Sequence, residues 1–364
     1  MTTSAYSNSI SQRVMHPLTV DVFQAARERM RQVYATYDKV AVSYSGGKDS
    51  TCCLEVTIEV ARELGKLPVD TLFCDEEILL GETLEMLERT RVRPEVNFKW
   101  VCAPVKYHNP GSYDDPWWWP WDDSKKDVWV RQPPEYAIWL PEGPHPIPLH
   151  AMKLLYPPEC GKVACIVGLR GYESRPRMYG VLCSGGYIAR GPASHIDKVR
   201  PVYDWRDKDV WYAIHHNGWD YNKAYDKLYR LRKNPRELRV AVPTSIEAIS
   251  HFRDWMIGWP KLWEKVRKRI PGAHGVAIFY NLLHKPVRKV GETWQDAVYP
   301  YFEENPYGDG HQLELDLGKV LRAHRRHSTA PLHETKPCPL CHWNWKKLAR
   351  LTMFADPSRR LTIK

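Results

Sequence analysis

Apolar residues recur with a helical period before the first strand-like segment of the chain. Positions three or four residues apart predict an amphipathic helix that contains Phe23, Ala26, Met30, Val33 and Tyr37. A run of apolar and β-branched residues over 40–45 follows and predicts a strand. The next helical pattern covers residues 49–64, and Gly65 is a suitable stop for it. Its apolar face is expected to carry Cys53, Val56, Val60 and Leu64.

Strand-like and helix-like segments continue to alternate further along the chain. Strands are predicted over residues 71–74, 98–102 and 163–168, and another helix over residues 82–89. This alternation indicates an α/β fold with a doubly wound, mostly parallel sheet. Folds of this class bind ligands beyond the C-terminal ends of their strands. Three residues of interest lie at such ends, namely Ser45, Asp75 and Gly168.

The pattern divides the chain into three regions. Residues 1–38 are expected to form a helical lead-in, residues 39–240 the α/β domain, and residues 241–364 a mainly helical C-terminal region. Residues 103–160 form an insertion rich in proline and tryptophan, without clear periodicity, which is typical of a lid or a partner surface. Its tryptophans either stack on bases or, as we favour, pin the insertion to the sheet: Trp117, Trp118, Trp119, Trp121 and Trp129.

Composition narrows the class of protein further. The chain has 364 residues, of which 43% are hydrophobic, so it can bury a large core. Nine scattered cysteines favour reduced thiols over a disulfide framework. Because neither a signal-peptide pattern nor a membrane-length apolar run is visible, we expect a cytoplasmic protein without membrane contact. The net charge of +10 favours a polyanionic partner such as nucleic acid, although solvated helix faces also collect basic residues.

Residues 45–50 carry the most specific chemistry of the chain. They read Ser-Gly-Gly-Lys-Asp-Ser between a predicted strand and a predicted helix. Two adjacent glycines let the backbone turn sharply, and the amides that precede a helix form a nest for a phosphate chain. Lys48 adds a mobile positive charge, and Asp49 can hold a metal ion. The segment resembles the PP-loop of ATP pyrophosphatases, which cleave ATP between the α- and β-phosphates and adenylate a substrate.

A second motif, residues 168–177, follows the strand predicted over residues 163–168. It reads Gly-Leu-Arg-Gly-Tyr-Glu-Ser-Arg-Pro-Arg, with three arginines within eight residues. Arginine side chains at a strand end form a fork-shaped site for phosphate or sulfate, and Glu173 can pair with one of them. Taken alone, the same string is also compatible with a surface helix that begins with a salt bridge.

Together with residues 201–211 and 221–226, these motifs resemble the phosphoadenosine-phosphosulfate (PAPS) reductase-like branch of the PP-loop superfamily. Weaker strings over most of the chain resemble, more narrowly, the immunoglobulin-binding regulator A proteins of prophages and mobile elements. The resemblance implies ATP binding at residues 45–50 and a ParB/sulfiredoxin-like partner. True reductases carry a nucleophilic cysteine in a Glu-Cys-Gly-x-His string. No such string occurs here, so PAPS reduction is not expected.

The chemistry expected from the motifs is adenylyl transfer. Amides around Gly46 and Gly47 would hold the pyrophosphate, and Lys48 would balance charge in the transition state. Asp49, alone or with Asp75, would position Mg²⁺. Arg170 and Arg175 would clamp the α-phosphate or an acidic substrate. The expected nucleotide-binding set is Ser43, Ser45, Gly46, Gly47, Lys48, Asp49, Ser50, Asp75 and Gly168.

Two other functions are open at this point. One is a non-catalytic, ATP-sensing regulator that binds DNA or a ParB-like partner. The other is sulfur transfer to nucleic acid, as in phosphorothioation, for which Cys74 or Cys102 would carry the persulfide.

The C-terminal tail contains candidate metal ligands. Cys338 and Cys341 form a Cys-x-x-Cys pair behind His327 and His333, and two thiolates with two imidazoles suit tetrahedral zinc. Competing ligands are His324 and His342. A redox pair and two inert thiols are the alternatives. An iron–sulfur cluster would use Cys160, Cys165 and Cys183, but Cys165 reads more simply as part of a buried strand.

Overall fold

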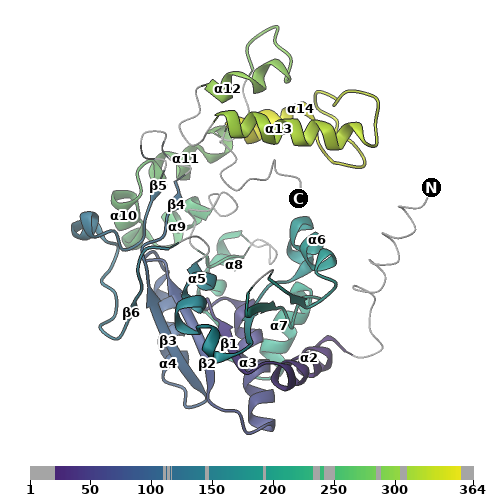
Figure 1. Ribbon diagram of the computed structural model, residues 1–364. Coiled ribbons are helices and arrows are strands. Elements are labelled where there is room, and N and C mark those ends of the chain that lie inside the picture. The colour runs from purple at the N-terminus through teal and green to yellow at the C-terminus, as the bar shows by residue number, and fades with distance from the viewer. Residues whose placement is uncertain are drawn as a thin grey trace. The chain divides into compact units, whose positions relative to one another are not determined.

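The computed structural model describes residues 21–109, 112, 115, 117–143, 147–191, 194–232, 238–241, 251–283, 288–303 and 310–353 (Figure 1). The chain divides into two compact units. Unit 1 comprises residues 1–106 and 119–242, and unit 2 comprises residues 107–118 and 243–364. Part of the predicted insertion, residues 107–118, therefore belongs to the second unit. Among the described helices, none combines the length and the apolar character needed to cross a membrane.

A seven-stranded sheet forms the centre of unit 1, in the order β6-β3-β2-β1-β7-β9-β8. Neighbouring strands run parallel, except that β8 is antiparallel to β9. The strands are β1 (Lys39–Ser43), β2 (Val69–Asp75), β3 (Val96–Cys102), β6 (Ile138–Trp139), β7 (Val163–Val167), β8 (Ile188–Ala189) and β9 (Ile196–Val199). The α/β class with a mostly parallel sheet, predicted from the alternation of patterns, is confirmed.

Helices connect these strands and cover the sheet. They are α2 (Val22–Thr36), α3 (Lys48–Glu63), α4 (Gly81–Arg91), α5 (Ile147–Leu155), α6 (Arg175–Cys183), α7 (Asp207–His216) and α8 (Ala224–Arg232). Helix α3 contacts both α2 and α7, whereas α5 packs on β2 within a separate cluster of buried residues. The sheet thus carries two hydrophobic clusters, as expected of a parallel sheet buried on both faces.

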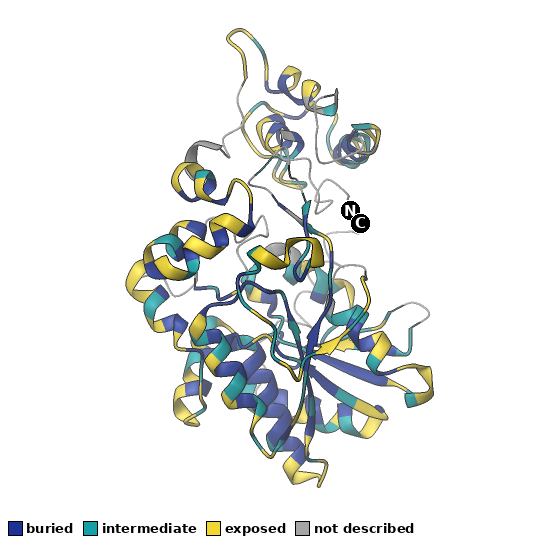
Figure 2. Ribbon diagram, turned by 90° about the vertical axis from the view of Figure 1, so that its left-hand side faces the viewer, coloured by how far each residue is buried: buried dark blue, intermediate teal, exposed yellow. Residues whose placement is uncertain are grey.

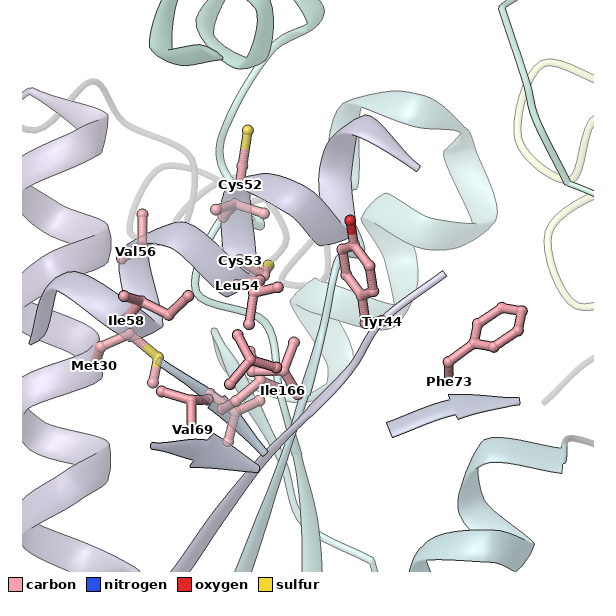
Figure 3. Close-up of a cluster of buried hydrophobic side chains, with 14 of the residues drawn as sticks. Met30, Tyr44, Cys52, Cys53, Leu54, Val56, Ile58, Val69, Phe73 and Ile166 are labelled. Carbon is pink, nitrogen blue, oxygen red and sulfur yellow. The ribbon is translucent and has the colours of Figure 1, made fainter. Parts of the chain in front are cut away.

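Helix α3 is the most buried helix of unit 1, and Figure 3 shows its side chains gathered with those of α2 and the central strands. Burial is not restricted to the predicted face, because Cys52 and Leu54 are as buried as Cys53. Leu64 lies just past the helix and is 44% exposed. Gly65 then adopts φ +65°, a left-handed conformation that terminates helices and is easily adopted by glycine. In Figure 2 this helix appears dark blue along most of its length.

The chain changes direction across the sheet at β1. Strand β1 pairs with β2 on one side and with β7 on the other. The connections that leave the C-terminal ends of these strands consequently diverge, which opens a crevice at this edge of an α/β sheet. Residues 45–50 follow β1 directly, so the fold places them at the position where such sheets bind ligands.

Asp75, the last residue of β2, and Glu77 are buried and bind Trp121 of the insertion through hydrogen bonds. Trp121 is 2% exposed; its Nε1 donates a hydrogen bond to the Asp75 carbonyl (2.8 Å), and its backbone N–H donates one to Glu77 (2.9 Å). Its ring packs against Trp129 with a centroid separation of 5.3 Å and against Trp139 at 6.1 Å. These contacts support the packing interpretation for this part of the tryptophan-rich segment.

Unit 2 is mainly helical. Its short ribbon pairs β4 (Tyr107–His108) with β5 (Trp117–Trp118). Its helices are α9 (Phe252–Gly258), α10 (Pro260–Arg269), α11 (Ala273–Leu283), α12 (Pro300–Glu303), α13 (Gly310–Arg325) and α14 (Trp345–Met353).

A helical stripe of tryptophans in unit 2 is interrupted by proline. Trp255, Trp259 and Trp263 are spaced four residues apart and are all buried. Trp255 lies in α9 and Trp263 in α10, with Trp259 between them, because Pro260 lacks an amide hydrogen and begins α10 rather than continuing α9.

The burial of α3 leads to a stability prediction. Leu54→Ala is expected to lower the free energy of unfolding of unit 1 by about 3 kcal/mol, because it opens a cavity at a side chain that is 1% exposed. Leu64→Ala, at the exposed end of the same helix, is expected to cost less than about 1 kcal/mol. Urea denaturation followed by circular dichroism measures both. Equal losses in the two variants would contradict the packing described for α3.

Candidate functional site

Residues 45–50, here called the glycine loop, join β1 to the first turn of α3. Gly46 has φ +70°, which a residue with a side chain rarely adopts. Gly47 is the N-cap of α3 and has no side chain to cap it, so the amides of the first turn depend on other partners. Lys48 begins the helix, and its side chain is buried. The loop therefore has the geometry of an anion site at a helix N-terminus.

Two serine hydroxyls close the glycine loop. The Oγ atoms of Ser45 and Ser50 are 3.0 Å apart, and Ser50 Oγ donates to the Gly47 carbonyl at 2.9 Å. Ser45 Oγ in turn accepts from the Gly47 amide at 3.4 Å. Ser43, predicted to bind the nucleotide, lies before the loop in β1, in register with Leu72 of β2. Ser43 takes no part in these hydrogen bonds among Ser45, Gly47 and Ser50.

Residues 221–226 hold the glycine loop from a distant part of the chain. Tyr225 accepts a hydrogen bond from the Lys48 amide through its hydroxyl oxygen, at 3.0 Å. Asn222 is fully buried, and its Nδ2 donates to the Gly46 carbonyl at 3.1 Å and to Thr83 Oγ1 at 2.8 Å. Burial raises the pKa of Tyr225, so its hydroxyl stays neutral at physiological pH. The sequence motif that contains these residues thus has a structural role at the site.

Gly168 allows the end of β7 to approach α3. A Cβ at this position would lie 2.6 Å from the Ser50 nitrogen and 2.7 Å from the Asp49 carbonyl carbon. Both neighbours are backbone atoms of a helix and are unable to move aside independently. Residue 168 was predicted to bind the nucleotide; the structure gives it a packing role, because only glycine fits there without displacing the start of α3.

A chain of ion pairs connects three segments beside the loop. Asp49 accepts from Lys48 Nζ at 3.2 Å and from Arg170 Nε at 2.6 Å. Arg170 Nη2 reaches Asp207 Oδ1 at 2.8 Å, and its Nη1 donates to the Trp205 carbonyl at 3.5 Å. Arg170 is only 1% exposed, so both carboxylates compensate its buried charge. This arginine positions Asp49 and Asp207 in addition to lining the site.

Next to these ion pairs lies a cavity of about 850 Å³, here called the cationic cavity. Of the described residues that line it, five are cationic and two are acidic. These described residues are Lys48, Arg170, Tyr172, Glu173, Arg206, Asp207, Lys208, Trp211, Leu238 and Arg239. Such an excess of positive charge suits a phosphate, sulfate or carboxylate group.

Arg177 is close enough to Arg170 and Arg239, two cationic residues of the cavity wall, to feel their charges. Burial, followed by the charge of Arg239, lowers the pKa of the Arg177 guanidinium. Glu173 forms an ion pair with Arg177 and accepts from the Arg170 amide at 3.4 Å. A bound anion would relieve the repulsion between these arginines.

Three cationic residues of the cavity wall were not among the predicted site residues. Arg206 and Lys208 lie in the segment 201–211, and Arg239 lies in a basic stretch of the chain. The signal for Arg206 and Lys208 was present in the motif Asp-Trp-Arg-Asp-Lys-Asp, but the pattern alone leaves open which charges face the loop. A second cavity of about 400 Å³ shares Trp211 and Leu238 with the first and also has Tyr225, Asp226, Tyr229 and Arg230 in its wall.

Asp75 does not fit the predicted role of a Mg²⁺ ligand. Its side chain is fully buried, and Oδ2 accepts from Trp100 Nε1 at 2.7 Å. Oδ1 accepts from the Glu77 amide at 3.0 Å and pairs with Arg131. Because its side chain has no exposed surface and its oxygens are engaged by protein donors, Asp75 anchors the insertion, whereas the Asp49 side chain keeps 15% of its surface exposed. Metal binding by Asp49 stays a prediction.

Arg175 is the first residue of α6, and its side chain lies outside the described part of the chain. Its expected contact with a phosphate therefore stays a prediction.

The cysteine–histidine tail gathers a different set of ligands from the predicted one. His324, His327, Cys338 and Cys341 have their candidate ligand atoms within 4.8 Å of one another. His333 is not part of this group: its Nδ1 accepts from the amides of Thr335 at 3.0 Å and Lys336 at 2.9 Å. The predicted ligand set contained His333; in the structure, His324 takes this place in the group.

The structure does not support the two other cysteine sites considered from the sequence, an iron–sulfur cluster and a persulfide carrier. Among the described residues, Cys160, Cys165 and Cys183 do not form a metal-sized group. Burial raises the pKa of both Cys74 and Cys102, the two candidate persulfide carriers. Because only the thiolate is an effective nucleophile, these positions are unsuited to carry sulfur.

Comparison with known proteins identifies the family. The profile of the phosphoadenosine phosphosulfate reductase domain matches residues 39–231, which is more than half of the chain. The chain belongs to this family. The matched range contains the glycine loop, Arg170 and the Tyr225 contact.

Two relatives found by sequence comparison share 27% and 22% identical residues with this chain. The chain is 27% identical over 292 residues to the uncharacterized protein YbdN of Escherichia coli K12, covering 72% of this chain and 68% of YbdN. It is 22% identical over 211 residues to adenosine 5'-phosphosulfate reductase of Staphylococcus epidermidis, covering 57% of this chain and 74% of that enzyme. The narrower resemblance to immunoglobulin-binding regulator A stays a prediction.

Two solved structures illustrate the structural matches. The Candida glabrata FMN adenylyltransferase has a TM-score of 0.38 and 12% identity, with 60% of this chain and 65% of that chain covered. The Candida auris PAPS reductase, solved as a phosphate complex, has a TM-score of 0.35 and 15% identity, with 62% and 92% covered. The chain thus spans less than two thirds of the FMN adenylyltransferase.

The close approach at Gly168 yields a test of the site's construction. Gly168→Ala is expected to lower the free energy of unfolding of unit 1 by about 2 kcal/mol, because the new methyl group overlaps the start of α3. Gly81→Ala is the matched control, since its added Cβ meets no atom within 4 Å. Denaturant titration measures both variants. A Gly168→Ala protein as stable as the control would contradict the described contact.

Proposed function

We propose that the protein binds ATP at the glycine loop, cleaves it to AMP and pyrophosphate, and adenylates an anionic acceptor in the cationic cavity. The observation that carries this proposal is the position of the cavity. It shares Lys48 with the glycine loop and is walled by arginines from segments after β7 and before α7. A phosphate chain and a second anion would therefore lie side by side at one end of the sheet.

In the proposed reaction, an oxygen of the acceptor attacks the α-phosphorus of ATP. The bond between this phosphorus and the oxygen bridging to the β-phosphate breaks, and pyrophosphate leaves. Amides of the glycine loop and of the first turn of α3 would receive the pyrophosphate, and the Lys48 side chain would offset the charge that develops on the bridging oxygen. The protein needs no nucleophile of its own for this step. Where Mg²⁺ takes part, Asp49 is the carboxylate of the loop that would hold it.

Reduction of a phosphosulfate is not proposed, although the family name includes it. The chain lacks the Glu-Cys-Gly-x-His string. Desolvation raises the pKa of five cysteines of unit 1, which keeps them protonated: Cys52, Cys53, Cys74, Cys102 and Cys165. The same property disfavours sulfur transfer through Cys74 or Cys102.

One observation favours a second candidate, an ATP-sensing regulator without turnover. The amide of Lys48 already donates to the Tyr225 hydroxyl, so one donor of the nest is engaged before a nucleotide arrives. A nucleotide that displaced this hydroxyl would loosen residues 221–226 from the loop and signal its own binding. A ParB/sulfiredoxin-like partner and nucleic acid remain predictions from sequence for either function.

Pyrophosphate release from Mg-ATP tests the proposal. The wild-type protein is expected to release pyrophosphate rather than phosphate, and Lys48→Ala is expected to slow this release by about 100-fold, since it removes transition-state charge compensation. Lys66→Ala, an exposed lysine beyond the other end of α3, is the matched control and should leave the rate unchanged. The assay is run with and without DNA as acceptor.

Each outcome of this assay separates the candidates. Tight ATP binding without turnover under all conditions would favour the regulator. Absence of ATP binding would overturn the assignment of the glycine loop. Incorporation of labelled sulfur into nucleic acid would favour sulfur transfer over both.

The cationic cavity makes a separate prediction. Arg239→Ala is expected to weaken binding of ATP or of an anionic acceptor by about tenfold, because a hydrogen bond to a charged group contributes about 1.5–3 kcal/mol. Arg253→Ala, at an exposed arginine of unit 2, is the control. Isothermal titration calorimetry at two salt concentrations measures the effect, which should shrink as salt rises. Unchanged affinity for all anions tested would contradict the role given to this cavity.

A further inference from the structure

Four side chains of unit 2 converge at the junction between α13 and α14. His324 lies in the last turn of α13, and His327 lies just beyond it. Cys338 and Cys341 belong to the segment before α14, and all four candidate ligand atoms lie within 4.8 Å of one another. Across the group, His324 Nδ1 is 3.3 Å from Cys341 Sγ, and His327 Nε2 is 3.5 Å from Cys338 Sγ.

These separations match the edges of a zinc coordination tetrahedron. With Zn–N distances of about 2.0–2.1 Å and Zn–S distances of about 2.3 Å, nitrogen and sulfur ligands of tetrahedral zinc lie about 3.6 Å apart. Both nitrogen–sulfur distances are close to this value before any metal is added. We propose that His324, His327, Cys338 and Cys341 bind one Zn²⁺ ion, which cross-links α13 to the segment that precedes α14.

A hydrogen bond outside the group fixes the tautomer of His324. Its Nε2 lies 3.0 Å from the Ala330 carbonyl oxygen, which only accepts hydrogen bonds, so Nε2 carries the proton. Nδ1 is then unprotonated and presents its lone pair to the side where Cys341 lies. Metal-ligating histidines generally donate their second ring N–H to a carbonyl or carboxylate in this way. The imidazole is 5% exposed, so its orientation is fixed by the surrounding protein.

The backbone that carries the two cysteines forms a closed turn. The His342 amide donates to the Cys338 carbonyl at 2.8 Å, the Cys338 amide donates to the Trp343 carbonyl at 2.9 Å, and His342 adopts φ 61°. These backbone hydrogen bonds fix the turn from which both thiols reach the group.

The ligand set indicates a structural ion rather than a catalytic one. Four protein ligands fill a tetrahedral site and leave no position for water or substrate. Two thiolates with two imidazoles select zinc over magnesium or calcium, which prefer oxygen ligands. The site borders a small hydrophobic cluster of α13 and α14 that includes Leu317, Val320, Trp345 and Leu348. A cluster of this size gains stability from a metal cross-link.

Metal analysis of the full-length protein tests the proposal. Protein purified without chelator is expected to contain one zinc per chain by inductively coupled plasma mass spectrometry. His324→Ala and Cys341→Ser are expected to lose the zinc. His333→Ala and Cys183→Ser are the matched controls, since each removes a histidine or cysteine outside the group, and both should retain it.

A spectroscopic measurement on the wild-type chain keeps the test independent of whether the variants fold. After exchange with Co²⁺ alone, the protein should show the visible d–d bands of tetrahedral cobalt and a thiolate charge-transfer band. Metal lost from His333→Ala but kept in His324→Ala would overturn the ligand set. A chain without bound metal, or with Cys338 and Cys341 joined in a disulfide, would overturn the site itself. None of these outcomes depends on ATP turnover.

Discussion

The buried guanidinium of Arg170 is the interaction on which the arrangement of the site depends. It joins the first turn of α3 through Asp49 and the start of α7 through Asp207, and it stands directly after β7. Removing one partner of such a buried group would leave a charge uncompensated in a region of low dielectric, at a cost of about 3–5 kcal/mol. The ion pairs therefore hold three distant segments together and also set the charge at the floor of the cationic cavity.

The proposed chemistry follows from this arrangement rather than from the family name. Members of one family share a fold, but activity resides in the residues that face the ligand. Here those residues are amides at a helix N-terminus, one lysine and several arginines, and no described cysteine lines the cationic cavity. Such a site is consistent with the proposed adenylyl transfer. The proposal therefore rests on the residues of the site and not on the name of the family.

The acidic residues after β2 show that the position of a residue at a strand end does not establish its role. Asp75 lies at the edge of the sheet where ligands bind, yet its carboxylate faces Trp100 and Arg131. Glu77 likewise receives the amides of Trp121 and Val130, at 2.9 and 3.2 Å. Glu77 thus replaces water at two backbone amides of the insertion, and Asp75 pairs with the Arg131 side chain of the same segment. An irregular segment is held to the sheet because buried carboxylates satisfy its donors.

The sequence by itself determined the elements of the α/β unit, the parallel sheet and the position of the glycine loop. Helix and strand periods, the glycine pair and the stop at Gly65 are local properties, and they act over a few residues. Only the tertiary structure decided which charged side chains meet. Asp207 lies beside Arg170, the Asp75 carboxylate meets Trp100 and Arg131, and His324 rather than His333 lies beside the cysteines. These choices depend on the direction in which each side chain leaves its helix or turn and on the packing of segments far apart in the chain, which no local pattern encodes.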